Sequence, residues 1–297
     1  MTTKLHGVLT PLITPFGTDG QVDVKQLRAV VDRSIDGGVH GVVVNGTSGE
    51  FQTMTSSERR HVVETVVEHT AGRVPVVAQT GALRTSEAVE LTRHAQEVGA
   101  DVAMVIAPYY DPLSVEAVKA YYRSIADSVE IPIMLYNMPS VTGVDLKLDT
   151  ISELAEKCPN INYVKNTSPN MAQAVQLVRE LGDRVGTFVG WDTLALSSFV
   201  EGAGLMAATA NVVPAQLVAV YDAVQAGDLE QAQRLWKDVY PIVAAIDSEP
   251  FIAAIKWCLE TAGCPVGATR ISTSPISETS AQRLAQLTSD ALALPRA

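Results

Sequence analysis

Short apolar runs, rich in β-branched residues, alternate with longer amphipathic segments along most of the chain. The runs are continuously apolar, as in parallel strands that are covered on both faces. They predict strands at 7–14, 41–46, 74–80, 102–107, 131–137, 161–166, 185–190 and 204–210. Between and after them, apolar positions at helical spacing predict helices near 23–37, 56–71, 85–98, 114–128, 147–157, 169–181, 192–202 and 214–226.

This order of strands and helices indicates the fold class. Several predicted helices begin at a residue suited to an N-cap, such as Asp23, Ser56 and Ser114. Eight strand–helix units over roughly 225 residues match the size and order of an α/β fold of the (β/α)8 TIM barrel type. A doubly wound sheet is the alternative, but no GxGxxG turn follows the first predicted strand.

Beyond residue 226 the pattern changes to helices alone. One amphipathic segment runs from Asp228 to about Ile246, a second from about Pro250 to Ala262, and a third from Ser277 to about Leu292. No linker or low-complexity stretch separates them from the rest. We therefore expect a barrel over 1–226, which holds the catalytic site, and a C-terminal three-helix extension over 227–297.

Composition and charge exclude several classes of protein. Hydrophobic residues make up 47% of the chain, enough for a large core. The net charge of -11 argues against a nucleic-acid partner, and no apolar run of 18 residues predicts a membrane span. Three cysteines form no metal-binding cluster and no disulfide framework, so we expect reduced thiols, no metal and a cytoplasmic protein.

A lysine and a tyrosine stand at the ends of two neighbouring predicted strands. Tyr136 lies in the apolar segment 131–137, and Lys165 lies in 161–166. Burial of an ammonium ion is costly, and a lysine amine without its proton is the nucleophile that forms a Schiff base with a ketone or aldehyde. A phenol beside it can move the protons that this reaction needs. The simpler interpretation is that Lys165 reaches solvent from a strand end.

Two further strand ends carry polar groups. The second strand is followed by Asn45-Gly46-Thr47-Ser48-Gly49-Glu50, whose hydroxyls and backbone amides could hold a small carboxylate. An ordinary glycine–serine turn is the alternative. Tyr110 follows the fourth strand, where tyrosines are most often core or interface residues. In a parallel barrel all these strand ends meet at one face, the face that carries active sites.

At these motifs the chain resembles the dihydrodipicolinate synthase / N-acetylneuraminate lyase family of pyruvate-dependent class I aldolases. The resemblance extends over essentially the whole chain, and the spacing of the motifs agrees as well as their content. The segments that carry it are 46–50, 108–110, 135–143, the strand of Lys165, 190–192 and 209–212.

The resemblance implies roles for the residues around the lysine. Lys165 would form the imine with pyruvate, and Tyr136 would move protons to and from the reacting groups. The hydroxyl of Thr47 would link Tyr136 to Tyr110, which in this family reaches across from a neighbouring subunit. The expected assembly is a homotetramer, a dimer of dimers. The covalent imine needs no cofactor.

The same resemblance implies the pyruvate-binding groups. Thr47 and Ser48, with Gly49 in the same loop, would hold the carboxylate of pyruvate. The backbone carbonyl of Met206 would line the pocket. The partners implied are therefore small molecules, pyruvate together with an aldehyde or the 2-oxo acid that they form.

Val141 departs from the family pattern. In the family's lysine-pathway synthase an arginine at this position holds the carboxylate of aspartate semialdehyde. Losing such a charge-assisted contact costs roughly 1.5–3 kcal/mol. Leu83 stands where the regulatory lysine site of that enzyme has a polar residue, and Asn166 follows Lys165 where acidic or other residues occur.

Three functional hypotheses follow. The first is a Schiff-base lyase or aldolase that joins or separates pyruvate and an aldehyde, with a 2-keto-3-deoxy sugar acid or a 4-hydroxy-2-oxo acid as the larger substrate. Val141 favours it. The second is 4-hydroxy-tetrahydrodipicolinate synthase activity, which condenses pyruvate with aspartate semialdehyde. The third is a non-catalytic barrel that binds a 2-oxo acid, and the joint presence of Tyr136 and Lys165 argues against it.

Overall fold

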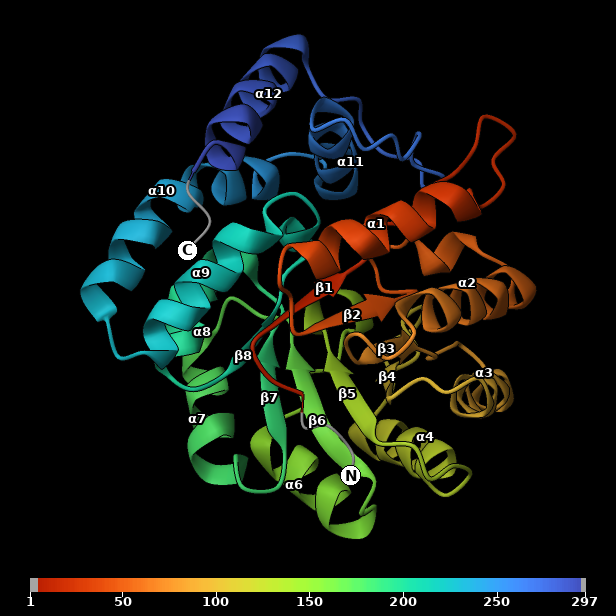
Figure 1. The fold of residues 1–297 in the computed structure, drawn as a ribbon. Coiled ribbons are helices and arrows are strands. Elements are labelled where there is room, and N and C mark those ends of the chain that lie inside the picture. The colour runs from red at the N-terminus through yellow and green to blue at the C-terminus, as the bar shows by residue number, and fades with distance from the viewer. Residues whose placement is uncertain (1–4, 295–297) are drawn as a thin grey trace.

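Parallel strands close into a barrel in the computed structural model, which describes residues 5–294. Within these residues each strand pairs with the next, and β8 pairs with β1, so that eight strands form one closed sheet (Figure 1). This confirms the predicted (β/α)8 fold. The strands are β1 (Val8–Pro11), β2 (Gly41–Val44), β3 (Val76–Gln79), β4 (Val102–Ile106), β5 (Ile133–Asn137), β6 (Ile161–Asn166), β7 (Gly186–Val189) and β8 (Gly204–Met206).

Helices surround the barrel and cover the outer faces of the strands (Figure 1). Strands β1 to β5 are buried along their whole length, which explains why their sequences are continuously apolar. The helices of this layer are α1 (Val24–Asp36), α2 (Ser56–Thr70), α3 (Thr85–Glu97), α4 (Val115–Ala126), α6 (Leu148–Lys157), α7 (Met171–Leu181), α8 (Ala195–Val200) and α9 (Pro214–Gln225). The sequence did not predict α5 (Pro139–Thr142) or the 3-10 turns η1 (Phe51–Thr53) and η3 (Ala208–Asn211). The predicted helix at 192–202 begins with a 3-10 turn, η2 (Asp192–Leu194), and continues as α8.

The eighth strand is shorter than the sequence predicts. It ends at Met206, and the apolar residues that follow form η3. The reason lies in the side chain of Asn211, whose Nδ2 donates to the carbonyls of Pro11 and Ala208 at 2.9 and 2.8 Å. Its Oδ1 accepts the amide of Ile13 at 3.0 Å. The buried amide side chain of Asn211 thus connects the end of β1 to the turn. It takes the place of further backbone pairing between β1 and β8.

One predicted N-cap is wrong by one residue. Ser56 is the first residue of α2, and Thr55 is its N-cap. The Thr55 hydroxyl accepts the Glu58 amide at 3.2 Å, and the Glu58 carboxylate accepts the Thr55 amide at 2.9 Å, which is a capping box. Asp23 and Ser114 cap their helices as predicted.

Three helices follow the barrel within the described residues, α10 (Leu229–Asp247), α11 (Phe251–Thr261) and α12 (Glu278–Leu292). They gather on one side of the molecule, where α10 packs against α9 (Figure 1). The division of the chain at residues 226 and 227 stays a prediction. None of the helices in residues 5–294 has the length and apolar character of a membrane span.

The segment between α11 and α12 returns to the barrel and lies against the chain after β1. The Phe16 amide donates to the Val266 carbonyl at 3.1 Å. Gly267 has a φ of 69°, and a Cβ placed on it would lie 2.0 Å from the Phe16 carbonyl oxygen. Only glycine allows both this backbone conformation and this close approach.

We therefore expect Gly267→Ala to lower the free energy of unfolding by about 2–4 kcal/mol, since the left-handed conformation costs roughly 1–2 kcal/mol and the clash adds to it. Gly227→Ala is the matched control, because Gly227 has a φ of 78° and a Cβ placed on it would meet no atom within 4 Å. Urea unfolding of both variants measures the difference. An equal decrease in the free energy of unfolding of both variants would show that the close approach to Phe16 does not affect stability.

Candidate active site

Lys165 and Tyr136 lie side by side inside the barrel. They are directly paired in the register of β5 and β6, and both are buried, at 5% and 2% exposure. The Lys165 Nζ lies 4.3 Å from the centroid of the Tyr136 ring. The buried location excludes the simpler interpretation in which Lys165 reaches solvent from a strand end.

A second pair on the same two strands faces away from the barrel interior. Because side chains alternate along a strand, Asn137 and Asn166 share the opposite face, and the Asn137 Nδ2 donates to the Asn166 Oδ1 at 2.9 Å. The same Nδ2 donates to Asp145 at 2.9 Å, and Gln173 donates to this carboxylate at 3.0 Å. Burial raises the pKa of Asp145, but these bonds and Lys147 together hold it below its usual value. A charged network thus holds the two strand ends together.

Thr47 completes the interior group. Its Oγ1 lies 3.2 Å from the Tyr136 hydroxyl, which is hydrogen-bonding distance in either direction. The Tyr136 hydroxyl also lies 3.3 Å from the Met138 sulfur, to which it can donate. Thr47 is half-buried and Ser48 is 6% exposed. The structure therefore brings together Thr47, Tyr136 and Lys165 from three different strand ends.

The loop that carries Thr47 and Ser48 has an unusual backbone. Asn45 and Glu50, which flank it, both have a φ of 58°. The Gly49 amide donates to the Gly46 carbonyl and the Glu50 amide to the Thr47 carbonyl, both at 3.0 Å. These two bonds close a tight turn, so Thr47 and Ser48 project from a fixed loop. Left-handed residues other than glycine are uncommon and cluster at functional sites.

Two residues shape the space around the lysine. A Cβ on Gly190 would lie 2.7 Å from the Lys165 Cε, so the absence of a side chain at Gly190 makes room for the amine. Met206, the last residue of β8, is 1% exposed.

Asp192 is a buried acid to which the sequence assigned no role. It follows β7, and its Oδ2 accepts the Thr209 amide at 2.7 Å. Burial raises its pKa, and the positive charge of Lys165 acts in the opposite direction without cancelling that effect. Asp192 therefore lies within electrostatic reach of the lysine. Its position at the carboxyl end of a barrel strand was the signal that could have identified it.

Two predicted site residues lie apart from the buried group in a single chain. Tyr110 is 83% exposed, and Val141 on α5 is 43% exposed. Their positions follow β4 and β5, at the same face of the barrel as Lys165.

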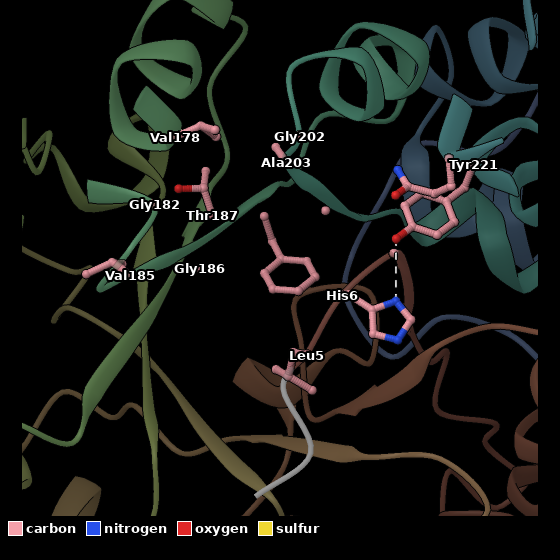
Figure 2. A pocket seen from close by; sticks show the side chains of 14 residues that line it. Leu5, His6, Val178, Gly182, Val185, Gly186, Thr187, Gly202, Ala203 and Tyr221 are labelled. Atoms are coloured by element: carbon pink, nitrogen blue, oxygen red, sulfur yellow. Dashed lines mark hydrogen bonds between the residues drawn. The ribbon is translucent and has the colours of Figure 1, made fainter. Parts of the chain in front are cut away.

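A cavity of about 390 Å³ lies at the opposite end of the barrel (Figure 2). Gly186 and Gly204, which begin β7 and β8, line it together with His6 and Tyr221. The Tyr221 hydroxyl lies 3.5 Å from the His6 Nδ1. None of the residues predicted for catalysis lines this cavity, so the candidate site is the other end. Within residues 5–294 no cluster of three or more histidine, cysteine, aspartate or glutamate side chains could hold a metal ion.

Comparison with known proteins agrees with this geometry. The Dihydrodipicolinate synthetase family matches residues 4–291. The chain belongs to this family. A 4-hydroxy-tetrahydrodipicolinate synthase from Phenylobacterium zucineum is 40% identical over 275 residues, which cover 92% of each protein. As a member of the dihydrodipicolinate synthetase family, the protein is an enzyme of the pyruvate-dependent class I aldolase and lyase type.

Solved structures of family members superimpose closely. The dihydrodipicolinate synthase from Acinetobacter baumannii, complexed with pyruvate, gives a TM-score of 0.93 at 32% identity and covers 98% of this chain and 100% of its own. YagE, a prophage protein of the family from E. coli K12 in complex with pyruvate, gives 0.92 at 30% identity, with 98% and 99% covered. The expected family and barrel are thereby confirmed.

Proposed function

We propose that the enzyme binds pyruvate as an imine on Lys165 and forms or cleaves a carbon–carbon bond between pyruvate and an aldehyde. The observation that carries this proposal is the buried Lys165 amine, 4.3 Å from the Tyr136 ring, with the Tyr136 hydroxyl 3.2 Å from Thr47. An amine nucleophile beside a hydroxyl pair is what imine formation requires. Family members with pyruvate bound support the choice of keto acid.

In the proposed reaction Tyr136 carries the protons, supported by its hydrogen bond to Thr47. The unprotonated Lys165 amine adds to C2 of pyruvate, and the carbinolamine loses water when Tyr136 gives a proton to the departing hydroxyl. The Thr47 hydroxyl can donate a hydrogen bond to the Tyr136 phenolate that remains, since their oxygens lie 3.2 Å apart. This phenolate takes a proton from C3, which gives an enamine. As the enamine adds to the aldehyde carbonyl, Tyr136 gives that proton to the new alkoxide. Hydrolysis of the resulting imine releases a 4-hydroxy-2-oxo acid and restores Lys165, with no net oxidation or reduction.

The carboxylate of pyruvate would be held by Thr47 and Ser48, with Gly49 giving the loop its tight shape. The Met206 carbonyl would also line the pocket. Support comes from the fixed turn at Gly49 and from the position of Met206 at the end of β8. These donors are oriented before the substrate arrives, which lowers the cost of binding.

We also propose that Tyr110 acts in a neighbouring copy within a homotetramer. Its 83% exposure at the active-site face leaves it available to another subunit. A cytoplasmic location fits the three cysteines, which are buried and unpaired.

For the aldehyde, the relatives favour aspartate semialdehyde over the sugar-acid type of substrate. Relatives at 39–40% identity over 92% of this chain are named 4-hydroxy-tetrahydrodipicolinate synthase. On this ground condensation of pyruvate with aspartate semialdehyde is the first activity to measure.

One observation favours a second candidate. Val141, 43% exposed on the short helix after β5, offers no charge where the resemblance places a carboxylate-binding arginine. An aldehyde that carries hydroxyls instead of a second carboxylate would fit this position. The larger substrate would then be a 2-keto-3-deoxy sugar acid or a related 4-hydroxy-2-oxo acid.

The imine is tested by trapping. Incubation with pyruvate and borohydride should add the mass of one reduced pyruvate adduct to the peptide that contains Lys165. Lys165→Ala should take no label, and Lys157→Ala, which removes an exposed lysine paired with Glu153 on α6, should label like the wild type. A label on any other lysine would refute the proposal.

Tyr136→Phe should lower kcat by roughly 10²–10⁴, the usual range for a positioned acid or base. Tyr163→Phe is the control, because Tyr163 lies on β6 and its hydroxyl accepts the Leu5 amide at 3.3 Å, away from the lysine. Pyruvate release or consumption, coupled to lactate dehydrogenase, measures both variants. A loss below about threefold in Tyr136→Phe would remove it from the proton path.

Val141→Arg separates the two candidate aldehydes. If the wild type lacks a carboxylate anchor, the arginine should raise turnover of aspartate semialdehyde and lower activity on a hydroxylated substrate, because a guanidinium is larger and remains charged. The gain should stay below a factor of about 10–200, since no surrounding residues orient the new side chain. Leu229→Arg, at a comparably exposed position on α10, controls for added charge. Efficient wild-type turnover of aspartate semialdehyde, unchanged in Val141→Arg, would decide in favour of the synthase activity.

A further inference from the structure

Glu50 is a fully buried carboxylate that the proposed reaction does not use. It lies three residues after Thr47, at the end of the loop 46–49, which we call the substrate loop. The Glu50 side chain points away from this loop toward the C-terminal extension. The Glu50 Oε1 lies 2.9 Å from the Lys256 Nζ on α11. The Glu50 Oε2 accepts the backbone amides of Arg270 and Ile271, both at 2.8 Å.

Lys256 is the buried partner of this pair. Its side chain is 4% exposed, and its Nζ also donates to the Ala268 carbonyl at 2.9 Å. Burial lowers the pKa of Lys256, while the charge of Glu50 acts in the opposite direction. Because both groups are out of water, removing either one leaves the other charge uncompensated in the interior.

The backbone of Glu50 is held in a conformation that it would not adopt by itself. Its φ of 58° and ψ of 34° are left-handed, which is unfavourable for a residue with a side chain. Such a conformation persists where the surroundings fix it. Within its own loop, the Glu50 carbonyl accepts the Thr53 amide and hydroxyl at 2.9 and 2.8 Å. The Glu50 side chain is held by Lys256 and the amides of 270–271, all of them in the C-terminal extension.

A single hydrogen bond joins this strained residue to the substrate loop. The Glu50 amide donates to the Thr47 carbonyl at 3.0 Å. If Glu50 relaxed toward an ordinary φ, that amide would turn away and the Thr47–Ser48 segment would lose its fixed position. The 3.2 Å contact between Thr47 and Tyr136 depends on the same segment.

Neighbouring contacts fix the extension where it meets this loop. The Arg270 side chain donates to the Gly20 carbonyl and forms an ion pair with Glu58 at 2.6 Å. Its guanidinium lies 4.1 Å from the Phe16 ring centroid, and the Lys256 Nζ lies 4.6 Å from the same ring. These contacts fix the C-terminal extension in place against the loop after β2.

We propose that Glu50 and Lys256 are positioning residues, through which the C-terminal extension orients Thr47 and Ser48 for the carboxylate of the keto acid. This inference rests on the proposed function of that loop. It predicts a loss of pyruvate affinity in the folded enzyme, beside any loss of stability, since the pair acts on the shape of a binding loop. A purely structural ion pair would change the amount of folded enzyme and leave the affinity of the folded enzyme intact.

The test is imine trapping over a range of pyruvate concentrations, with urea unfolding of each variant in parallel. Lys256→Met should raise the half-saturating pyruvate concentration by about tenfold or more, because small displacements of positioning groups have large effects. Labelling at saturating pyruvate should still reach Lys165. Lys256→Arg, which keeps the charge, should recover part of the affinity. Arg179→Met is the control, since it removes an exposed ion pair to Glu201 of similar length, 2.8 Å.

Failure of this inference and failure of the proposed function give different results. A half-saturating concentration within about twofold of wild type in folded Lys256→Met would overturn the inference. If Lys256→Met does not fold, Glu50→Gln decides in its place, because it keeps the size of the side chain and removes its charge. Again an unchanged half-saturating concentration overturns the inference, and a rise of about tenfold supports it. Failure of the wild type to label on Lys165 would instead refute the proposed function, and the inference with it.

Discussion

In the proposed reaction the amine of Lys165 lies inside a closed barrel, out of water, and still has to reach a substrate. Burial of a charged or polar group is costly unless the surroundings compensate. The groups around the amine come from the two strands that flank β6, namely β5 and β7 with the residues that follow it. The Tyr136 ring lies 4.3 Å from the amine, Gly190 leaves space beside the Lys165 Cε, and Asp192 lies close enough for the lysine charge to oppose the rise that burial causes in the pKa of its carboxyl group.

The strand register determines which groups surround the amine. Direct pairing of Tyr136 with Lys165 places both on the inner face, and the same register places Asn137 and Asn166 together on the outer face. A shift by one residue would exchange the two faces. The hydrogen bonds of Asn137 to Asn166 and to Asp145 therefore do more than satisfy buried amides, because they oppose such a shift at the strand ends.

The fold and half of the site could be predicted because they depend on local patterns. Continuous apolar runs predict buried parallel strands, and residues at strand ends must meet in a barrel, so the sequence alone was enough to group Tyr136, Lys165 and Thr47. The Glu50–Lys256 pair could not be found in this way, since its partners lie far apart in sequence and α11 has no fixed place in a barrel pattern. The end of β8 was misplaced for a similar reason, because the hydrogen bonds of Asn211 after it reach Pro11 and Ile13, about 200 residues away in sequence.

The two halves of the site differ in how strongly the structure constrains them. The part proposed to bind pyruvate lies in the core. Its position depends on the strand register, on the loop after β2 and, by the inference above, on the C-terminal extension. A substitution there disturbs several buried contacts at once. The part proposed to bind the aldehyde includes Val141, which is 43% exposed on a helix of one turn. Exposed positions tolerate substitution with little effect on stability, so the second substrate can change while imine formation remains. This asymmetry explains why the fold, the lysine and the tyrosine identify the family, whereas the choice of aldehyde has to be measured.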